Sequence, residues 1–197
     1  IFINTSGIGV IAQGIKIGSD RARIGDKIIL SGTIADHGIT VLTQREGLSF
    51  ESSVESDSAP LNHMVADMLA ASRDIRVLRD PTRGGVGTAL NEIAEKSAVG
   101  IRIYEELIPV RDEVAGMCEL LGFDPLYLAN EGKLLAFVAA DAADQVLATV
   151  RSNEFGEDAV IIGEVVPDYS GKVFMQTRIG GERMVDMLTG EQLPRIC

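Results

Sequence analysis

Short apolar runs typical of strands are interleaved irregularly with segments of helical periodicity, and this order constrains the fold more than any other feature of the chain. We expect strands over 1–10, 27–31, 75–78, 101–103, 133–139, 159–165 and 172–177, the last two paired as a hairpin. We expect helices over 36–46, 85–97 (closed by Gly100), 111–121 and 141–152, and one more that Ser58 caps and that holds Pro60 in its first turn. The irregular order predicts an α+β fold with a mixed or antiparallel sheet and flanking helices.

The composition is acidic, because the 197 residues carry a formal net charge of -11. Broad binding to nucleic acid or to an anionic membrane needs a cationic surface, so we expect neither partner. No apolar run approaches the roughly 20 residues of a membrane span, and no signal-peptide pattern is present. The two cysteines, Cys118 and Cys197, form neither a disulfide framework nor a metal-ligand pair, so we expect a cytoplasmic protein without a metal site of its own.

Residues 80–85 (DPTRGG) form a turn between an expected strand and an expected helix. Exposed amides at a helix N-terminus favour anions, and the fork-shaped guanidinium of Arg83 suits phosphate oxygens. Arg83, Gly84 and Gly85 are therefore candidates for phosphate contacts, and Asp80 is a possible supporting residue. An Asp-Pro turn followed by a glycine-rich helix start is the structural alternative.

Residues 130–133 (NEGK) lie at the start of the most strand-like run of the chain. A carboxylate flanked by apolar residues can act as a general base near neutral pH, which makes Glu131 a candidate. The alternative is a turn in which Glu131 and Lys133 form a surface ion pair. Asp36 and His37, at the start of an expected helix, are possible supporting residues, as is Asn130.

Cys197 is the last residue of the chain and follows Pro194 by three positions. A terminal segment is the part of a protein least held by a core, so this thiol could be presented to another active site and then returned to its own. Cys118, in contrast, lies in an expected helix, where a buried free thiol is the usual case. The alternative for Cys197 is a frayed end without a function.

Four segments follow one another as 32–38 (GTIADHG), 80–85 (DPTRGG), 130–133 (NEGK) and 194–197 (PRIC). This combination strongly resembles the HypE family of hydrogenase maturation proteins. That family belongs to a superfamily with aminoimidazole ribonucleotide synthetase, formylglycinamidine ribonucleotide synthetase and selenophosphate synthetase. The first three segments have relatives across the superfamily, whereas the tail that ends in cysteine is peculiar to this branch. The resemblance covers essentially the whole chain.

The resemblance implies the C-terminal domain of the aminoimidazole ribonucleotide synthetase-like fold. Residues 1–20 would be a remnant of an N-terminal ATP-binding domain, 21–187 the C-terminal α+β domain, and 188–197 a flexible carrier tail. The chain begins at Ile1 in what we interpret as the middle of a strand, so we expect a fragment of a longer protein. Most ligands of ATP and Mg²⁺ would then lie upstream, and the fragment alone would be inactive and would not dimerise as the intact protein does.

The resemblance also implies the chemistry. In the family, HypF places a carbamoyl group on the terminal thiol, and an ATP-dependent dehydration converts this group to a thiocyanate. The cyanide then passes through the HypC–HypD complex to the iron of nickel–iron hydrogenase, and the intact protein is a homodimer. Cys197 would be the carrier and Glu131 the base, while Lys133 or Arg83 would stabilise charge on the transferred phosphate.

Two other functions stay open at this point. The chain could be a non-catalytic docking module, whose tail would tolerate Ser at position 197. It could also be a related ATP-dependent synthetase acting on a small molecule, which would need no terminal cysteine.

Overall fold

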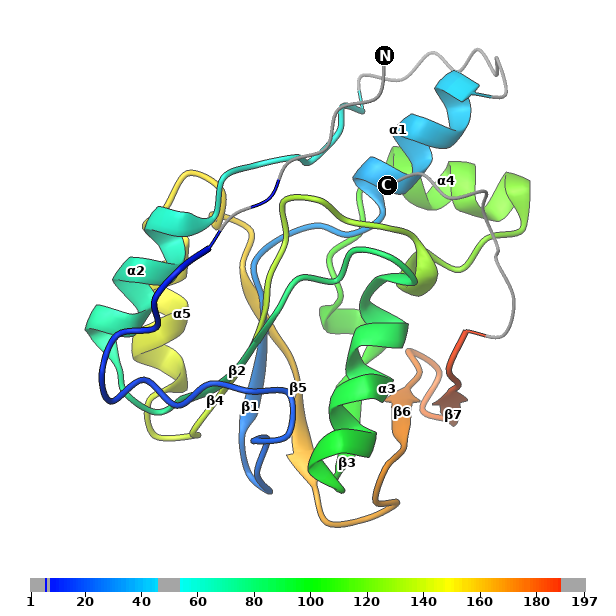
Figure 1. Ribbon diagram of the computed structural model, residues 1–197. Helices are drawn as coiled ribbons and strands as arrows, with labels where there is room; N and C mark the ends of the chain where they lie inside the picture. Colours follow the sequence, from blue (N-terminus) through cyan, green and yellow to red (C-terminus); the bar gives the residue numbers. More distant parts are fainter. Residues whose placement is uncertain (1–5, 7, 46–53, 189–197) are drawn as a thin grey trace.

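The computed structural model describes residues 6, 8–45 and 54–188, and its centre is one mixed sheet (Figure 1). The strands are β1 (Lys27–Leu30), β2 (Ile75–Arg79), β3 (Gly100–Tyr104), β4 (Leu135–Val138), β5 (Val160–Val166), β6 (Val173–Gln176) and β7 (Glu182–Val185). They lie in the order β2-β4-β1-β5-β3-β6-β7, and only β3 and β6 run parallel to each other among these seven strands. The expected α+β fold with a mixed sheet is confirmed.

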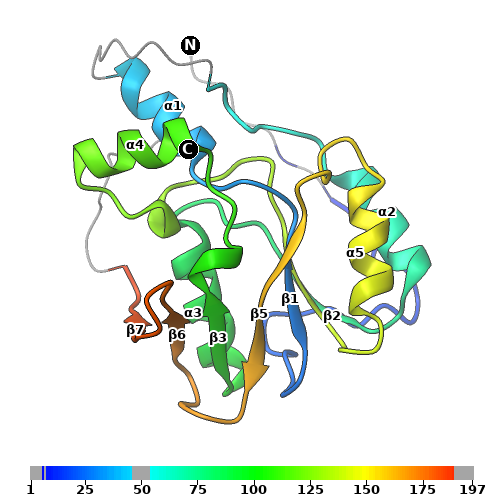
Figure 2. The same cartoon turned by 180° about the vertical axis from the view of Figure 1, so that it is seen from behind.

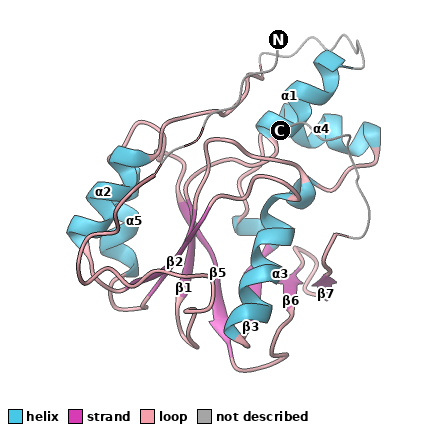
Figure 3. Cartoon of the chain, viewed as in Figure 1, coloured by secondary structure: helices cyan, strands magenta, loops and turns pink. Residues whose placement is uncertain are grey.

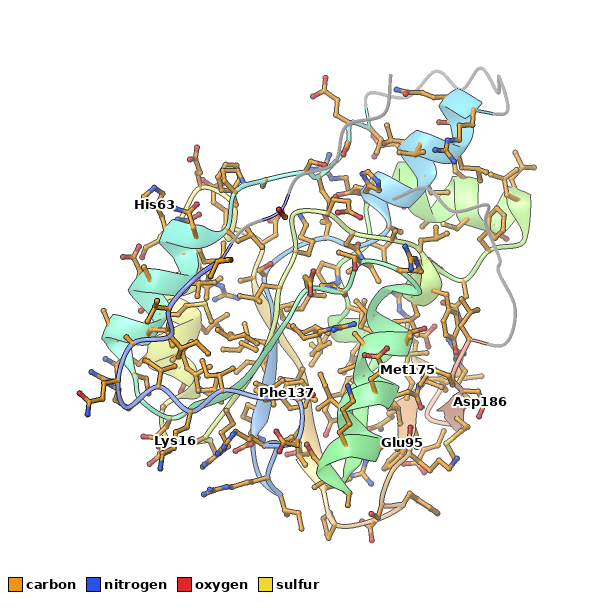
Figure 4. The ribbon with its side chains drawn as sticks, viewed as in Figure 1. Lys16, His63, Glu95, Phe137, Met175 and Asp186 are labelled. Carbon is orange, nitrogen blue, oxygen red and sulfur yellow. The ribbon has the colours of Figure 1, made fainter. Side chains whose placement is uncertain are left out.

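Helices cover the sheet in separate groups. The helices are α1 (Asp36–Arg45), α2 (Asn62–Ala71), α3 (Gly85–Ser97), α4 (Asp112–Leu121) and α5 (Ala143–Arg151), with short 3-10 turns η1 (Glu105–Leu107) and η2 (Pro125–Tyr127). One face of the sheet packs on α3, and Phe137 lies between them in the largest core cluster (Figure 4). The antiparallel pair α2 and α5 covers the other face over β2, β4 and β1.

Over the rest of the sheet, the described residues place no α-helix on this second face. Seen from behind, no described helix lies over β5, β3 and β6 (Figure 2). Helices α1 and α4 instead pack on each other at one end of the sheet, around Ile39, Val114 and Cys118 (Figure 3). This end holds the loops that follow β1 and precede β4, so functional side chains on those loops lie together there.

The ends of α3 show how glycine fixes the local structure. The helix occupies Gly85–Ser97 as predicted, and Gly84 and Gly85 at its start have φ values of 74° and 63°. Side chains rarely adopt this left-handed conformation, so glycine is needed for the turn. At the other end the helix stops at Ala98, with φ 52°, whereas Gly100, which we expected to close it, is the first residue of β3.

Several other expectations are wrong. Residues 159–165 and 172–177 do not form a hairpin, because β5 pairs with β1 and β3, while β6 pairs with β3 and β7. The second helix begins at Asn62 rather than beside Ser58, and the last begins at Ala143 rather than beside Asp141. Within the expected strand 1–10, residues 1–5 and 7 lie outside the described residues, and Ile8–Val10 is exposed and irregular. None of the described helices is both long enough and apolar enough to cross a membrane.

Candidate active site

A cavity of about 440 Å³ opens at the end of the sheet where α1 begins. Its walls come from the loop after β1, the segment 55–59, the start of α4, the residue two positions before β4, and the loop after α5. The lining residues are Ser31, Gly32, Thr33, Asp36, Glu55, Ser56, Asp57, Ser58, Ala59, Arg111, Lys133, Glu154, Phe155, Glu157 and Asp158. Six of these side chains are acidic and two are basic, so the cavity has a surplus of negative charge.

Asn130 joins the three internal segments that the sequence singled out. Its side chain is fully buried, its Oδ1 accepts a 2.8 Å hydrogen bond from the Ala35 N–H, and its Nδ2 donates to the carbonyls of Pro81 and Leu128 at 3.0 Å each. Backbone groups therefore bind both the oxygen and the nitrogen of the Asn130 side-chain amide. Asn130 is a positioning residue, and its neighbour Glu131 is held in place through it.

Asp57 organises the base of the cavity and was missed by the sequence analysis. Its Oδ1 accepts a 3.0 Å hydrogen bond from the backbone N–H of Glu131, and its Oδ2 lies 3.7 Å from Nζ of Lys133. Both side chains are mostly buried, with exposed fractions of 2% for Asp57 and 12% for Lys133. Lys133 is thus paired with Asp57 inside the protein, and the alternative surface ion pair with Glu131 is not formed. Oε1 of Glu131 is buried without a hydrogen-bond partner.

Asp36 is the second buried carboxylate of the cavity. Its side chain is 1% exposed, and its Oδ2 accepts a 2.6 Å hydrogen bond from Oγ1 of Thr33 and lies 3.5 Å from Nε of Arg111. Its Oδ1 is buried and has no partner. Burial raises the pKa of Asp36, and the hydrogen bond from Thr33 and the charge of Arg111 only partly oppose this rise.

His37, the next residue, faces the segment 55–59. Its Nδ1 lies 2.8 Å from Oγ of Ser56, and its Nε2 is buried without a partner. The second histidine, His63, is exposed at the outer end of α2 (Figure 4) and does not line this cavity.

The segment 80–85 lies behind the cavity rather than in its wall. The carbonyl of Pro81 accepts from Asn130, but Asp80 and Arg83 are exposed and do not line the cavity. A Cβ on Gly85 would collide with the carbonyl oxygens of Leu126 and Leu128, so this glycine is required for close packing against η2. A phosphate contact by Arg83, Gly84 or Gly85 stays a prediction.

The two thiols differ in what the structure says of them. Cys197 lies outside the described residues. Cys118 is 2% exposed in α4, as expected, and burial together with the charge of Asp124 raises its pKa to about 11. Its thiol therefore stays protonated and unreactive at neutral pH.

Arg111 was also missed, because the sequence analysis treated it only as the start of a helix. It precedes α4, its side chain is half exposed, and its Nε pairs with Asp36 within the described part of the chain. The outer nitrogens of its guanidinium are therefore available to a ligand in the cavity. Among the described residues, no group of three or more His, Cys, Asp or Glu side chains could hold a metal ion.

Comparisons with known proteins agree on the relatives of this chain. The family of AIR synthase related proteins, C-terminal domain, matches residues 23–176. The chain is 54% identical over 197 residues to the carbamoyl dehydratase HypE of Azotobacter vinelandii, a match that covers 100% of this chain and 58% of that protein. The chain thus spans little more than half the length of this curated relative.

Two solved structures are similar as well. A crystal structure of the hydrogenase maturation protein HypE in complex with ATP has a TM-score of 0.87 at 48% identity, covering 92% of this chain and 55% of that one. A crystal structure of a HypE–HypF complex has a TM-score of 0.86 at 46% identity, covering 90% of this chain and 58% of that one. The chain therefore belongs to the AIR synthase related proteins, whose C-terminal domain it contains, and within that family it resembles HypE.

Proposed function

We propose that this chain is the larger part of a carbamoyl dehydratase of hydrogenase maturation. Its reaction would convert an S-carbamoyl group on Cys197 to a thiocyanate, which supplies the cyanide ligand of the iron in nickel–iron hydrogenase. The observation that carries this proposal is the 54% identity, over the whole chain, to a carbamoyl dehydratase. In this proposal residues 1–20 end an N-terminal ATP-binding domain, 21–187 form the catalytic C-terminal domain, and 188–197 are the carrier tail.

The carbamoyl group needs a thiolate, and its dehydration needs a proton acceptor. Cys118 is unsuited to the first role because its pKa is about 11, so of the two cysteines in this chain we assign the carrier role to Cys197. Glu131 is suited to the second role because its Oε1 is buried and has no partner. Lys133, held beside it by Asp57, would stabilise negative charge on the amide oxygen or on the phosphoryl group.

ATP binding is proposed from a relative, because a HypE structure contains ATP. When bound, ATP supplies the phosphoryl group that turns the amide oxygen into a leaving group. Lys133 and Arg111 fit that phosphoryl end, whereas the six surrounding carboxylates do not suit a free triphosphate. We therefore expect most contacts to ATP and Mg²⁺ to come from the N-terminal domain of the full protein.

The partners follow from the same likeness. A HypE–HypF complex has been solved, and we propose HypF as the enzyme that loads the thiol of this protein. We propose the HypC–HypD complex as the acceptor of the cyanide, and a homodimer as the state of the full-length protein.

An intact-mass experiment tests the function. The full-length protein would be incubated with HypF, carbamoyl phosphate and ATP, with Cys197→Ala and Cys197→Ser as controls. The expected result is a carbamoylated species, then a species lighter by one water, both mapped to Cys197 and both absent from the two variants. Loading without any loss of water in the wild type would show a docking or carrier module rather than a dehydratase.

A further inference from the structure

The last strand of the sheet, β7, ends shortly before the proposed carrier tail. It is a four-residue strand at the edge of the sheet, and among the described strands it pairs only with β6. Of its side chains only that of Val185 is buried, and the next residue, Asp186 (Figure 4), is exposed. A short edge strand with so little buried apolar surface frays readily, so its end depends on contacts outside the sheet.

Two side chains bind the backbone at this end of β7. Asn91 of α3 is buried, and its Nδ2 donates a 2.8 Å hydrogen bond to the Val185 carbonyl and a 2.9 Å bond to the Gly87 carbonyl. The hydroxyl of Tyr127 in η2 donates a 2.8 Å bond to the Asp186 carbonyl. Two consecutive carbonyls of the chain are therefore each held by a side chain from another element.

The surroundings of Tyr127 fit this role. A Cβ on Gly87 would lie 2.7 Å from Cε1 of Tyr127, so the ring packs against α3 at a position where glycine leaves room for it. Gly87 and Asn91 are four residues apart and therefore lie on the same side of α3. An ion pair of 2.8 Å between Nη2 of Arg183 and Oδ2 of Asp124 also joins β7 to the residue before η2.

The segment that holds the end of β7 also holds the cavity. Asn130, three residues after Tyr127, accepts a 2.8 Å hydrogen bond from the Ala35 N–H. Ala35 precedes Asp36 of the cavity wall, and residues 128–130 are buried. The point where the chain leaves the sheet and the wall of the cavity are therefore attached to one segment, which fixes the distance between them.

We propose that Asn91 and Tyr127 are positioning residues, which set where the carrier tail leaves the domain and so how often Cys197 meets the cavity. The use of this position for dehydration rests on the proposed function. Nine residues, 189–197, lie beyond Leu188, and a chain of that length spans at most about 30 Å. A fixed exit point raises the effective concentration of the thiol at the cavity, because effective concentration falls as a linker grows longer.

Loss of the two side-chain contacts lengthens the linker. If the chain comes free back to Arg183, fifteen residues (183–197) replace nine (189–197), and length alone lowers the effective concentration about twofold. The loss of a fixed starting direction adds to this fall. We therefore expect a total reduction of roughly five- to tenfold when both contacts are removed.

A disulfide measures the effective concentration directly. In the full-length protein, Ser58→Cys places a thiol on an exposed residue of the cavity wall, and its equilibrium with Cys197 in a glutathione buffer reports how often the two thiols meet. Cys118 is buried and stays out of the exchange. Asn91→Ala combined with Tyr127→Phe should lower the effective concentration roughly five- to tenfold, and Tyr127→Phe alone roughly two- to threefold.

Tyr104→Phe is the matched control, because it removes a 2.9 Å hydrogen bond from a tyrosine hydroxyl to Oε1 of Glu164, between β3 and β5. It should leave the disulfide equilibrium unchanged. Single-turnover dehydration of protein that HypF has carbamoylated should slow in the double variant by the same factor as the effective concentration, while the Kd for ATP stays at the wild-type value. Damage to the cavity would instead slow dehydration without shifting the disulfide equilibrium.

The outcomes separate this role from the proposed function. An unchanged disulfide equilibrium in the double variant, or in Tyr127→Phe if the double variant does not fold, would overturn the role of these side chains. So would a wild-type dehydration rate at a lowered effective concentration. A shifted equilibrium in a protein that forms no thiocyanate would overturn the proposed function but not the position of the tail. Absence of the disulfide in Ser58→Cys alone would overturn both the carrier tail and its positioning.

Discussion

The backbone N–H of Glu131 donates a 3.0 Å hydrogen bond to Oδ1 of Asp57, a residue 74 positions earlier in the chain. This bond, with the ion pair between Asp57 and Lys133, joins the segment 55–59 to the start of β4. The wall of the cavity thus depends on the carboxylate of Asp57, which lies in a segment without regular secondary structure.

Replacing Asp57 with Asn should lower the free energy of unfolding by about 2–4 kcal/mol, because Lys133 is left buried without its counter-charge. Urea unfolding would measure the change. Lys27→Gln is the matched control, since it removes an ion pair to Glu164 whose side chains are 36% and 27% exposed. Loss of this exposed pair should lower the free energy of unfolding by about 0–1 kcal/mol. Equal losses in the two variants would contradict the claim that burial makes the pair of Asp57 and Lys133 the more important one.

Gly132→Ala should displace the segment 55–59. A Cβ at this position would collide with the carbonyl oxygen of Asp57 and lie 2.8 Å from the Ala59 nitrogen. We expect a loss of about 1–3 kcal/mol in the free energy of unfolding and a lower dehydration rate. Gly116→Ala in α4 meets nothing within 4 Å, so it should instead stabilise the protein by about 0.5–1 kcal/mol.

Asp36→Asn should increase the free energy of unfolding at neutral pH. Because burial raises the pKa of Asp36, the folded protein binds more protons than the unfolded chain between about pH 4 and the folded-state pKa. The contribution of Asp36 to the free energy of unfolding is thus fully present at low pH, and it falls by up to about 1.4 kcal/mol per pH unit across this window. Urea unfolding measured from pH 4 to 8 should show that the variant becomes more stable relative to wild type as the pH rises. A relative stability that falls with pH would contradict the raised pKa of Asp36.

Cys118 should be protected from thiol reagents in the folded protein. With a pKa of about 11, only about one thiol in a thousand is ionised at pH 8, and the side chain is buried as well. A disulfide reagent at this pH should therefore label Cys118 only after unfolding in urea. Rapid labelling of Cys118 in folded Cys197→Ala would contradict both the burial and the raised pKa.

The sequence predicts the helices α3 and α4 well because their ends are set locally. Gly84 and Gly122 adopt left-handed conformations at the start of one and the end of the other, and glycine is the residue that does so at least cost. Strand pairing is different. The runs that became β5 and β6 look like a hairpin in the sequence, yet β3 lies between them in the sheet, since partners are chosen by packing over long distances.

Only part of the candidate site could be predicted from the sequence, because some of its residues are brought together by long-range packing. Residues 130–133 and 32–38 stand out as polar segments beside apolar strands, and Asn130 does join them. Asp57 could not be separated from the other acidic residues of its segment, because its importance comes from burial beside Lys133. Arg111 is similarly ordinary in the sequence, and only its distance from Asp36 reveals it.

The strand order also determines how this protein folds. Of the described strands, only β6 and β7 are neighbours both along the chain and in the sheet, while Lys27 of β1 pairs with Val138 of β4. Contacts between such distant residues must overcome a large loop-closure entropy, which makes folding slow. The cavity draws on segments from Ser31 to Asp158 and therefore forms only once the central strands have met. A chain caught before that step lacks the cavity, so the candidate site and the central sheet are completed together.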